Sequence, residues 1–370
     1  MMLTIRLNGA EYTNFTEARV FWSMESAASA FSFTSSANEV SAFPLRVGDI
    51  VEVRADSAPV LTGYIEKLTV VYDARMHRIA VSGRSLLCDM IDSTVKTRKE
   101  FSGGTSLVSI ARAVLDDLGM SKVEVVDASG GVDPFDESEI TSARVGDQTA
   151  FEFLESFARK RQVLINTSPS GSLVLSRGGA AGPAPIQLRN YVSSDVNNIL
   201  SAEMSLDHVD RYNSYVVKSQ LNPVFLGLGI SAKNISDDQL GAATDTQIRA
   251  SRYYEMQAEE SSDAMTSAER AAWECNIRRA RSMSYKATVQ GHTFDGALVH
   301  PNMIVDVIDE LCDLASKLLV KSVEMVYTLD GGSLTTMDCT YKDAYTLQAE
   351  QSQRDAAAEE TGGQFEDLGI

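Results

Sequence analysis

Cysteine, proline and long apolar runs are scarce in this chain. Its 370 residues include only 8 Pro and 4 Cys, and the cysteines (Cys88, Cys275, Cys312 and Cys339) form no CxxC pair. Such widely spaced cysteines fit reduced, mostly buried thiols of a cytosolic product, so we expect no structural disulfide. No run approaches the roughly 18 apolar residues that span a bilayer, and the opening residues lack the apolar region of a signal peptide. We therefore expect no membrane anchoring.

Positive charge is also in short supply. Lys plus Arg number 33 against 51 Asp plus Glu, which gives a net charge of -18. A surface this acidic repels phosphate groups, so we expect no stable nucleic-acid binding and no attraction to an anionic membrane. Hydrophobic residues make up 44% and charged residues 23% of the chain, an ordinary globular composition. At about 150 residues per domain, the length predicts two or three domains.

Recognisable catalytic and metal-binding motifs are missing. The sequence has no Walker A motif, no HExxH, no GxSxG and no cluster of Cys and His. The Rossmann-like string at 227–232 lacks a convincing helix after it and is better read as a flexible loop. The acidic group Asp133, Asp136, Glu137 and Glu139 lacks the ligand spacing of an EF-hand, which favours a solvated loop. We predict no catalytic, cofactor-binding or metal-ligating residues and no cofactor.

The isolated histidines give no firmer sign of a catalytic or metal-binding site. The four histidines are read as surface or strand residues rather than ligands or bases: His77, His208, His292 and His300. A carboxylate-pair hydrolase stays open as an alternative, because some pair among 51 acidic residues could always face each other.

The first hundred residues predict β structure. Ile50–Arg54 alternates apolar and charged side chains, which is the period of a strand. Leu61–Tyr72 predicts a longer strand, in which Gly63 suggests a bulge or bend, and Arg78–Gly83 predicts another. Short strands at close spacing are typical of a small barrel or sandwich.

The middle of the chain has a different pattern. Thr105 is a candidate N-cap for a helix that ends at Gly119, and Thr149 begins a second helix. Strands are predicted at 122–126, 163–166 and 173–175, the last two forming a hairpin around 168–171. Residues 100–178 therefore predict a compact α+β domain, followed by a Gly-, Ala- and Pro-rich linker over 178–185.

From Ile186 the pattern returns to β, with strands at 214–219, 284–290, 303–308, 318–329 and 334–341. Leu221–Asp263 has weak periodicity and an excess of acids, so we read it as an insertion or mobile loop. The following helix, Ala264–Arg281, ends in Arg278, Arg279 and Arg281; these suit the helix dipole better than an acidic partner. The last residues, Gln348–Ile370, form an acidic tail that is either frayed or docks a partner.

Two hairpins from opposite ends of the chain resemble each other. Ile50–Val53 aligns with Ile304–Val307, and Leu61–Leu68 aligns with Leu319–Val326; in both copies a polar turn and another strand follow. Because antiparallel hairpins alternate in this way by chance, a true duplication and a coincidence are both open. A duplication would place two similar β-barrels on either side of the α+β domain.

The ordered short motifs resemble the baseplate hub proteins of contractile phage tails, in the Mu-like tail protein P / late control protein D family. The resemblance covers most of residues 1–347 and is weakest in the acidic insertion and the tail. The segments that carry it are 8–9, 23–31, 48–49, 61–65, 81–85, 89–92, 107–113, 159–164, 171–177, 210–215 and 301–302.

This resemblance implies a mainly β fold with α+β, consisting of two similar small β-barrel domains that flank an α+β domain. We predict a first barrel over 1–99 and an α+β domain over 100–178. The second barrel would consist of 179–230 together with 284–347. The acidic insertion and helix would span 231–283, and the acidic tail 348–370.

The resemblance also implies a structural protein of the virion tail baseplate, assembled in the host cytoplasm and not an enzyme. A homotrimeric ring would adapt the sixfold tail tube to the threefold central spike, and leave a channel for DNA. Its partners would be the tail tube protein, the central spike protein and the baseplate wedge proteins. Besides the hydrolase, the equivalent hub of a phage-tail-like bacteriocin or secretion spike stays open. Deletion of Gln348–Ile370 is expected to spare the trimer and weaken spike or wedge binding.

Overall fold

The computed structural model describes residues 3–36, 44–56, 58–74, 77–97, 100–137, 140, 148–161, 163–193, 196–218, 240–257 and 267–345. The chain divides into two compact units, residues 1–203 with 286–339 and residues 204–285 with 340–370. The Rossmann-like string at 227–232 and the acidic tail at 348–370 lie outside the described residues. In the described part, no helix is long and apolar enough to cross a membrane.

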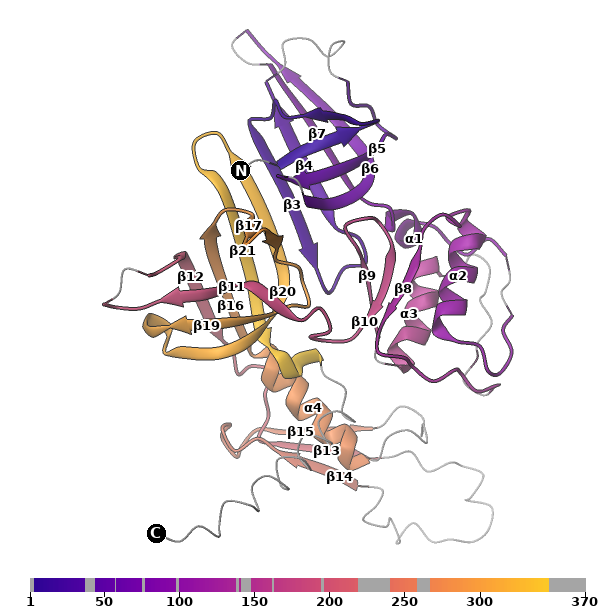
Figure 1. Ribbon diagram of the computed structural model, residues 1–370. Coiled ribbons are helices and arrows are strands. Elements are labelled where there is room, and N and C mark those ends of the chain that lie inside the picture. The colour runs from indigo at the N-terminus through magenta and orange to yellow at the C-terminus, as the bar shows by residue number, and fades with distance from the viewer. Residues whose placement is uncertain are drawn as a thin grey trace. The chain divides into compact units, whose positions relative to one another are not determined.

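The largest sheet of the structure has 13 strands and lies mainly in the first unit (Figure 1). The strands from the start of the chain are β1 (Leu3–Leu7), β2 (Ala10–Tyr12), β3 (Glu17–Ser23), β4 (Ala30–Ser35), β5 (Ile50–Ala55), β6 (Ala58–Tyr72) and β7 (His77–Ser85). They follow the sheet order β3-β4-β7-β6-β5-β1-β2. We call these strands the first half. The predicted strands at 50–54, 61–72 and 78–83 are all present.

The remaining strands of this sheet come from the end of the chain, and we call them the second half. They are β11 (Pro183–Asn190), β12 (Ile199–Leu206), β16 (Met283–Gln290), β19 (Ile304–Asp309), β20 (Leu314–Thr328) and β21 (Gly332–Tyr341). Their order is β12-β16-β21-β20, with β19 beside β20 and β11 beside β19. A short ribbon of β17 (Thr293–Phe294) and β18 (Ala297–Leu298) precedes β19. Among the described pairings none closes either half into a barrel, so the barrels stay a prediction.

The two halves repeat one topology. The strands β3-β4-β7-β6-β5-β1 and β12-β16-β21-β20-β19-β11 lie in the same order in the sheet and in the same order along the chain. This agreement extends the hairpin resemblance found in the sequence from two strands to six. The copies differ at one end, because β1 pairs with β5 antiparallel whereas β11 pairs with β19 parallel.

One antiparallel ladder joins the halves. Residues 17–23 of β3 pair with residues 322–328 of β20, from Ser23 opposite Ser322 to Glu17 opposite Thr328. Arg19 and Glu324 form an ion pair across this ladder, with Nη1 2.8 Å from Oε1. Strands more than 290 residues apart in sequence are therefore neighbours in the sheet.

Glycine at position 63 has a different role from the one predicted. A Cβ on Gly63 would lie 2.0 Å from the backbone oxygen of Arg84, and one on Gly83 would lie 1.8 Å from that of Tyr64. The irregularity in the β6–β7 ladder falls instead between Ile65 and Lys67. Gly63 therefore allows β6 and β7 to approach closely, and the predicted bulge lies beyond it.

The α+β domain follows β7. Its helices are α1 (Cys88–Asp92), α2 (Leu107–Leu118) and α3 (Ala150–Lys160), and its sheet has the order β8 (Val125–Ala128), β10 (Leu173–Ser176), β9 (Leu164–Thr167). Thr149 begins α3 and Gly119 ends α2, as predicted; the structure adds that Thr149 forms a capping box with Glu152 and that Gly119 is left-handed. The N-cap of α2 is Ser106 rather than the predicted Thr105, and the predicted linker gives way to β11 at Pro183.

The second unit corrects the expectation of a loop between 221 and 263. Part of that stretch forms β14 (Leu240–Thr244) and β15 (Tyr253–Gln257), which pair with either edge of β13 (Ser214–Lys218). The helix α4 (Ser267–Arg281) follows. A Cβ on Gly241 of β14 would meet the backbone of Ser267 at 1.8 Å, so this strand packs tightly against the start of α4. The remainder of the predicted loop is outside the described residues.

Candidate functional site

Burial shifts the pKa of two histidines and of the Cys88 thiol. Burial lowers the pKa of His292, whose Nδ1 lies 3.3 Å from Oγ1 of Thr335, to about 4. Burial also lowers the pKa of His300, which stacks on Trp22, to about 4. Burial raises the pKa of the Cys88 thiol to about 12. Because a thiolate is the nucleophilic form of cysteine, this thiol is inert at neutral pH.

The acidic residues at 133–139 serve local structure where they are described. The Glu137 carboxylate accepts a hydrogen bond of 2.6 Å from the backbone amide of Gly103, and Glu139 falls outside the described residues. Nowhere in the described ranges do three or more His, Cys, Asp or Glu side chains gather as metal ligands would.

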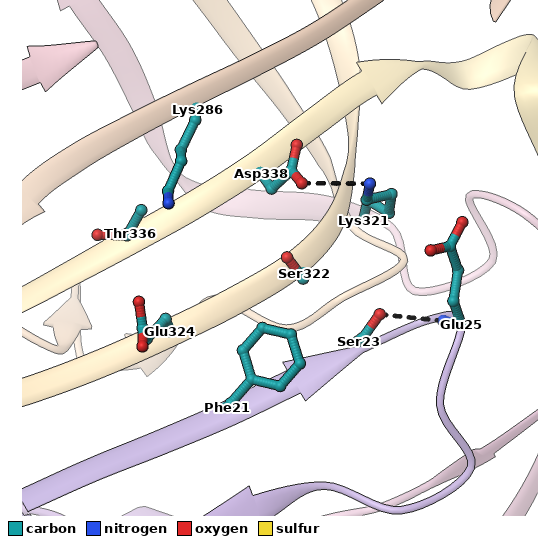
Figure 2. A pocket seen from close by; sticks show the side chains of 9 residues that line it. All are labelled: Phe21, Ser23, Glu25, Lys286, Lys321, Ser322, Glu324, Thr336 and Asp338. Carbon is teal, nitrogen blue, oxygen red and sulfur yellow. Dashed lines mark hydrogen bonds and ion pairs between the residues drawn. The ribbon is translucent and has the colours of Figure 1, made fainter. Parts of the chain in front are cut away.

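A shallow depression of about 270 Å³ lies over the seam between the halves (Figure 2). Its walls come from β3, β20, β21 and β16, and include Phe21, Lys286, Glu324 and Thr336. Lys321 and Asp338 pair across it, with Nζ 3.2 Å from Oδ2. The opposite charges in the walls are partly paired with each other, so this depression suits contact with a polar protein surface better than capture of one small charged ligand.

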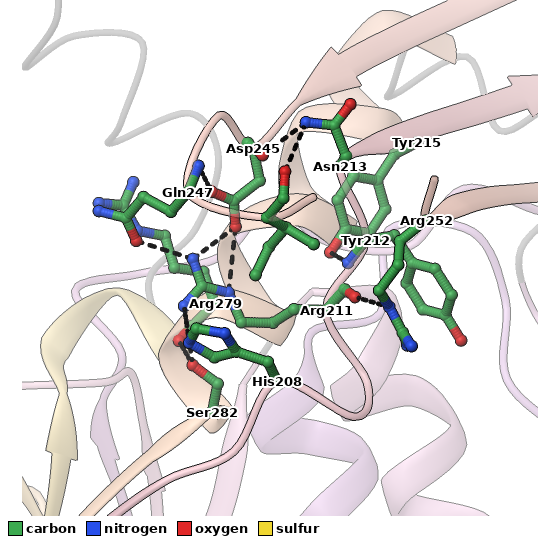
Figure 3. A network of polar contacts seen from close by, with 11 residues as sticks. His208, Arg211, Tyr212, Asn213, Tyr215, Asp245, Gln247, Arg252, Arg279 and Ser282 are labelled. Carbon is green, nitrogen blue, oxygen red and sulfur yellow. Dashed lines mark hydrogen bonds and ion pairs between the residues drawn. The ribbon is translucent and has the colours of Figure 1, made fainter. Parts of the chain in front are cut away.

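The second unit is organised around a buried arginine (Figure 3). The side chains of Arg211 and Asp245 are 6% and 2% exposed, and Nε and Nη2 of Arg211 donate to Oδ2 of Asp245 at 3.0 and 2.6 Å. Nη2 also donates to Oε1 of Gln247 at 2.9 Å, and Nη1 lies 3.3 Å from Nε2 of His208. The two charge-assisted hydrogen bonds to one carboxylate oxygen and the further partners offset the cost of burying two charges.

Aromatic and cationic side chains extend this network. The Arg252 guanidinium lies 4.7 Å from the ring centroid of Tyr212, and that of Arg278 lies 4.3 Å from the ring of Tyr254. The two tyrosine rings are 4.9 Å apart. Arg278 also pairs with Glu274 one turn earlier on α4. The motif at 210–215 and the basic end of α4 therefore stabilise this unit internally.

Exposed apolar side chains gather on two strand segments. At the end of β6, Val70, Val71 and Tyr72 are 39%, 43% and 75% exposed, and on β12 Leu200 is 59% exposed. Sequence analysis named neither segment as a site. The signal available was the run Val70-Val71-Tyr72, which breaks the alternation expected of a strand with one buried face.

Comparisons with known proteins agree with this architecture. Residues 2–85 match the family model for the N-terminal domain of Mu phage baseplate assembly protein GpP-like proteins, and residues 262–348 match that for the fourth domain of Mu phage baseplate assembly protein GpP. The chain is 26% identical to baseplate hub protein gp44 of Escherichia phage Mu, over 99% of this chain and 94% of that protein.

Two solved structures have the same fold. The 43 kDa tail protein of prophage MuSo2 from Shewanella oneidensis has a TM-score of 0.76 and 23% identity, covering 93% of this chain and 99% of that one. The tail protein from Neisseria meningitidis MC58 has a TM-score of 0.75 and 17% identity, covering 93% and 98%. Two family models at the two ends of the chain and a relative aligned along its length support a place in a Mu-like baseplate hub family.

Proposed function

We propose that this protein is the structural hub of a contractile tail baseplate, and that three copies form a ring around a central channel. The observation that carries the proposal is the repeated six-strand topology of its two halves. Three subunits with two similar halves each present six similar positions around one axis. Such a ring meets a sixfold tube on one side and a threefold spike on the other without a mismatch of symmetry.

The partners in this proposal are the tail tube protein, the central spike protein and the baseplate wedge proteins. The depression over the β3–β20 seam is a polar surface available for one of these contacts. The net charge of -18 supports a channel role for the acidic side chains. Carboxylates along a channel wall repel DNA phosphates, so that DNA passes without adhering.

The solution mass tests the ring. We expect light scattering on a sizing column, over a range of protein concentration and salt, to give a species near three times 40.2 kDa. Permanent complexes commonly bury more than about 2,000 Å², so this species should persist on dilution. A monomer at every concentration would contradict a ring formed by the free protein and would point to closure on the partners.

The role that we propose is not enzymatic. A peptidoglycan zymogram separates it from the hydrolase alternative, because a carboxylate-pair hydrolase clears the substrate whereas a hub leaves it intact. Clearing that is lost on substitution of one carboxylate would favour the hydrolase.

A further inference from the structure

The long strands β6 and β20 occupy equivalent places in the two halves but differ in their neighbours. Each is 15 residues long. The later part of β20, residues 322–328, lies between β21 and β3. The later part of β6, residues 66–72, pairs with β7, and its other edge has no partner among the described strands, because the β5 ladder ends at Tyr64. One strand neighbour present in the second half is therefore missing from the first.

Burial follows this difference. Residues 322–328 of β20 are buried or half-buried. Residues 66–72 of β6 are exposed except for the half-buried Leu68. A strand edge with free amide and carbonyl groups beside exposed Val and Tyr side chains is a template for pairing with another strand.

The repeat identifies the strand that would complete β6. In the second half, the extra neighbour of β20 is β3, which belongs to the first half. The equivalent of β3 in the second half is β12, since both stand at the end of the repeated six-strand order. By the same relation, the extra neighbour of β6 would be a β12.

The strand β12 is itself incompletely covered. Among the described strands it pairs only with β16, whereas β3 pairs with both β4 and β20. Its residues are exposed except for the half-buried Ile199 and Met204. Its length of eight residues is close to the seven residues of β3 and is enough to cover the seven open positions of β6. Among the described strands, residues 66–72 of β6 and the outer edge of β12 thus each lack the neighbour that the equivalent strand of the other half has.

We propose that β12 of one protomer pairs antiparallel with residues 66–72 of β6 in the next copy of this chain, as β3 pairs with β20 within one chain. This inference rests on the proposed ring and names the surfaces that close it. The two surfaces differ, so the contact is heterologous and a rotation about one axis closes it into a ring. Around the ring, β3–β20 ladders within subunits alternate with β12–β6 ladders between subunits.

Disulfide trapping in the full chain tests the pairing. Cys312 is half-exposed and the other three cysteines are buried, so Cys312→Ser gives a suitable background. Val71→Cys is combined in turn with Leu200→Cys, Ser201→Cys and Ala202→Cys, since facing residues of an antiparallel ladder have Cα atoms about 4.5–5.5 Å apart, within the range that a disulfide spans.

At least one double variant should run as a covalent trimer on a non-reducing gel and return to monomer with a thiol reductant. A mixture of the two single-cysteine variants should stop at a covalent dimer. Leu311→Cys with Leu329→Cys, two exposed positions outside both strands, is the matched control and should give no covalent trimer.

The outcomes separate this interface from the proposed ring. A trimer by light scattering with no covalent trimer from any of the three pairs would overturn the interface and leave the ring. Covalent dimers from Val71→Cys alone would show β6 facing its own copy and would also overturn it. A monomer at every concentration would overturn the interface together with the trimer of the free protein.

Charge substitutions give a second measurement without cysteines. Val71→Asp and Leu200→Asp should each raise the concentration needed for trimer formation by roughly tenfold or more, because each places a carboxylate in the new ladder. Leu311→Asp should leave it unchanged. Both sites are exposed in the single chain, so circular dichroism should be unaltered; equal association of all three variants would contradict the proposal.

Discussion

The strands β6 and β20 have the same length and the same place in their halves, yet their later parts have opposite environments. Residues 322–328 of β20 are covered by β3, and residues 66–72 of β6 are open. Burial along a strand thus depends on which neighbouring strand pairs with it, as well as on the strand's own pattern of apolar and polar residues. The two halves are therefore unequal in the single chain, and they would become equivalent in the ring that we propose.

The largest effect is expected in the insertion that only the second half carries, between β12 and β16. Arg211→Met leaves the Asp245 carboxylate, 2% exposed, without its partner. Breaking a buried pair in this way costs about 3–5 kcal/mol. We expect early unfolding of residues 204–285, measured by limited proteolysis and by hydrogen exchange.

The control for this variant is Lys218→Met, which removes the exposed Lys218–Glu255 ion pair of the same unit. Its effect on stability should be small, because a fully exposed ion pair is screened by solvent. Equal protease resistance of Arg211→Met and the parent would contradict the stabilising role given to the buried pair.

The next largest effect concerns the close approach of β6 and β7 in the first half. Gly83→Val places side-chain atoms against the backbone oxygen of Tyr64, 1.8 Å from a Cβ. Overpacking of this kind costs about 1–3 kcal/mol and occasionally more, so the urea midpoint of unfolding should fall.

In the second half, Gly331→Ala is the matched change, because its Cβ meets only the Thr328 hydroxyl at 2.7 Å. That hydroxyl accepts a hydrogen bond of 2.9 Å from the Gly331 amide, and its rotation costs only this exposed bond, so the variant should unfold closer to the parent than Gly83→Val does. A larger loss from Gly331→Ala than from Gly83→Val would reverse this contrast.

A pH effect is expected from His292, which is fully buried. Burial lowers its pKa in the folded state to about 4, below the ordinary 6.5. The unfolded chain then binds the proton more readily, so this contribution to stability is complete above pH 6.5 and is lost as pH falls toward 4. The total is up to about 3 kcal/mol.

His292→Gln removes the titrating group, and its unfolding free energy should fall less between pH 6.5 and pH 4 than that of the parent. Chemical denaturation at several pH values measures the slope. Identical slopes for the two proteins would show that His292 does not contribute to the acid sensitivity.

The smallest effect is expected at the ladder that joins the halves. Arg19→Ala removes the ion pair with Glu324, in which the arginine side chain is half-exposed. Exposed pairs contribute about 0.2–1 kcal/mol and weaken with salt. Thermal unfolding of this variant and of the parent should converge at high salt; a difference that persists there would assign the effect to packing of the Arg19 stem instead.

Local signals predicted much of the fold. The helix start at Thr149, the helix end at Gly119 and the hairpin of β9 and β10 were predicted from short-range rules and are present. The strand β14 was missed because Leu240–Thr244 contains Gly and two Ala instead of alternating large apolar residues. Those small residues suit its close packing against α4, which no local pattern reveals.

The resemblance of two short hairpins left a duplication and a coincidence both open, and the strand order extended the correspondence to β12 and β3. The open edge of β6 could not be predicted in this way. Its Val70-Val71-Tyr72 run has the composition of a strand, but composition does not show whether a neighbouring strand pairs with it.

By itself the sequence determined the class of the protein: an acidic, mainly β chain with an α+β domain and no catalytic motif, because composition, caps and strand periodicity are local properties. Only the tertiary structure decided that β3 reaches across to β20, that Arg211 is buried against Asp245, and that β6 and β12 each have an edge without a partner among the described strands. The physical reason is that pairing between strands hundreds of residues apart depends on the geometry of the whole sheet. No single segment of the sequence carries enough information to predict that geometry.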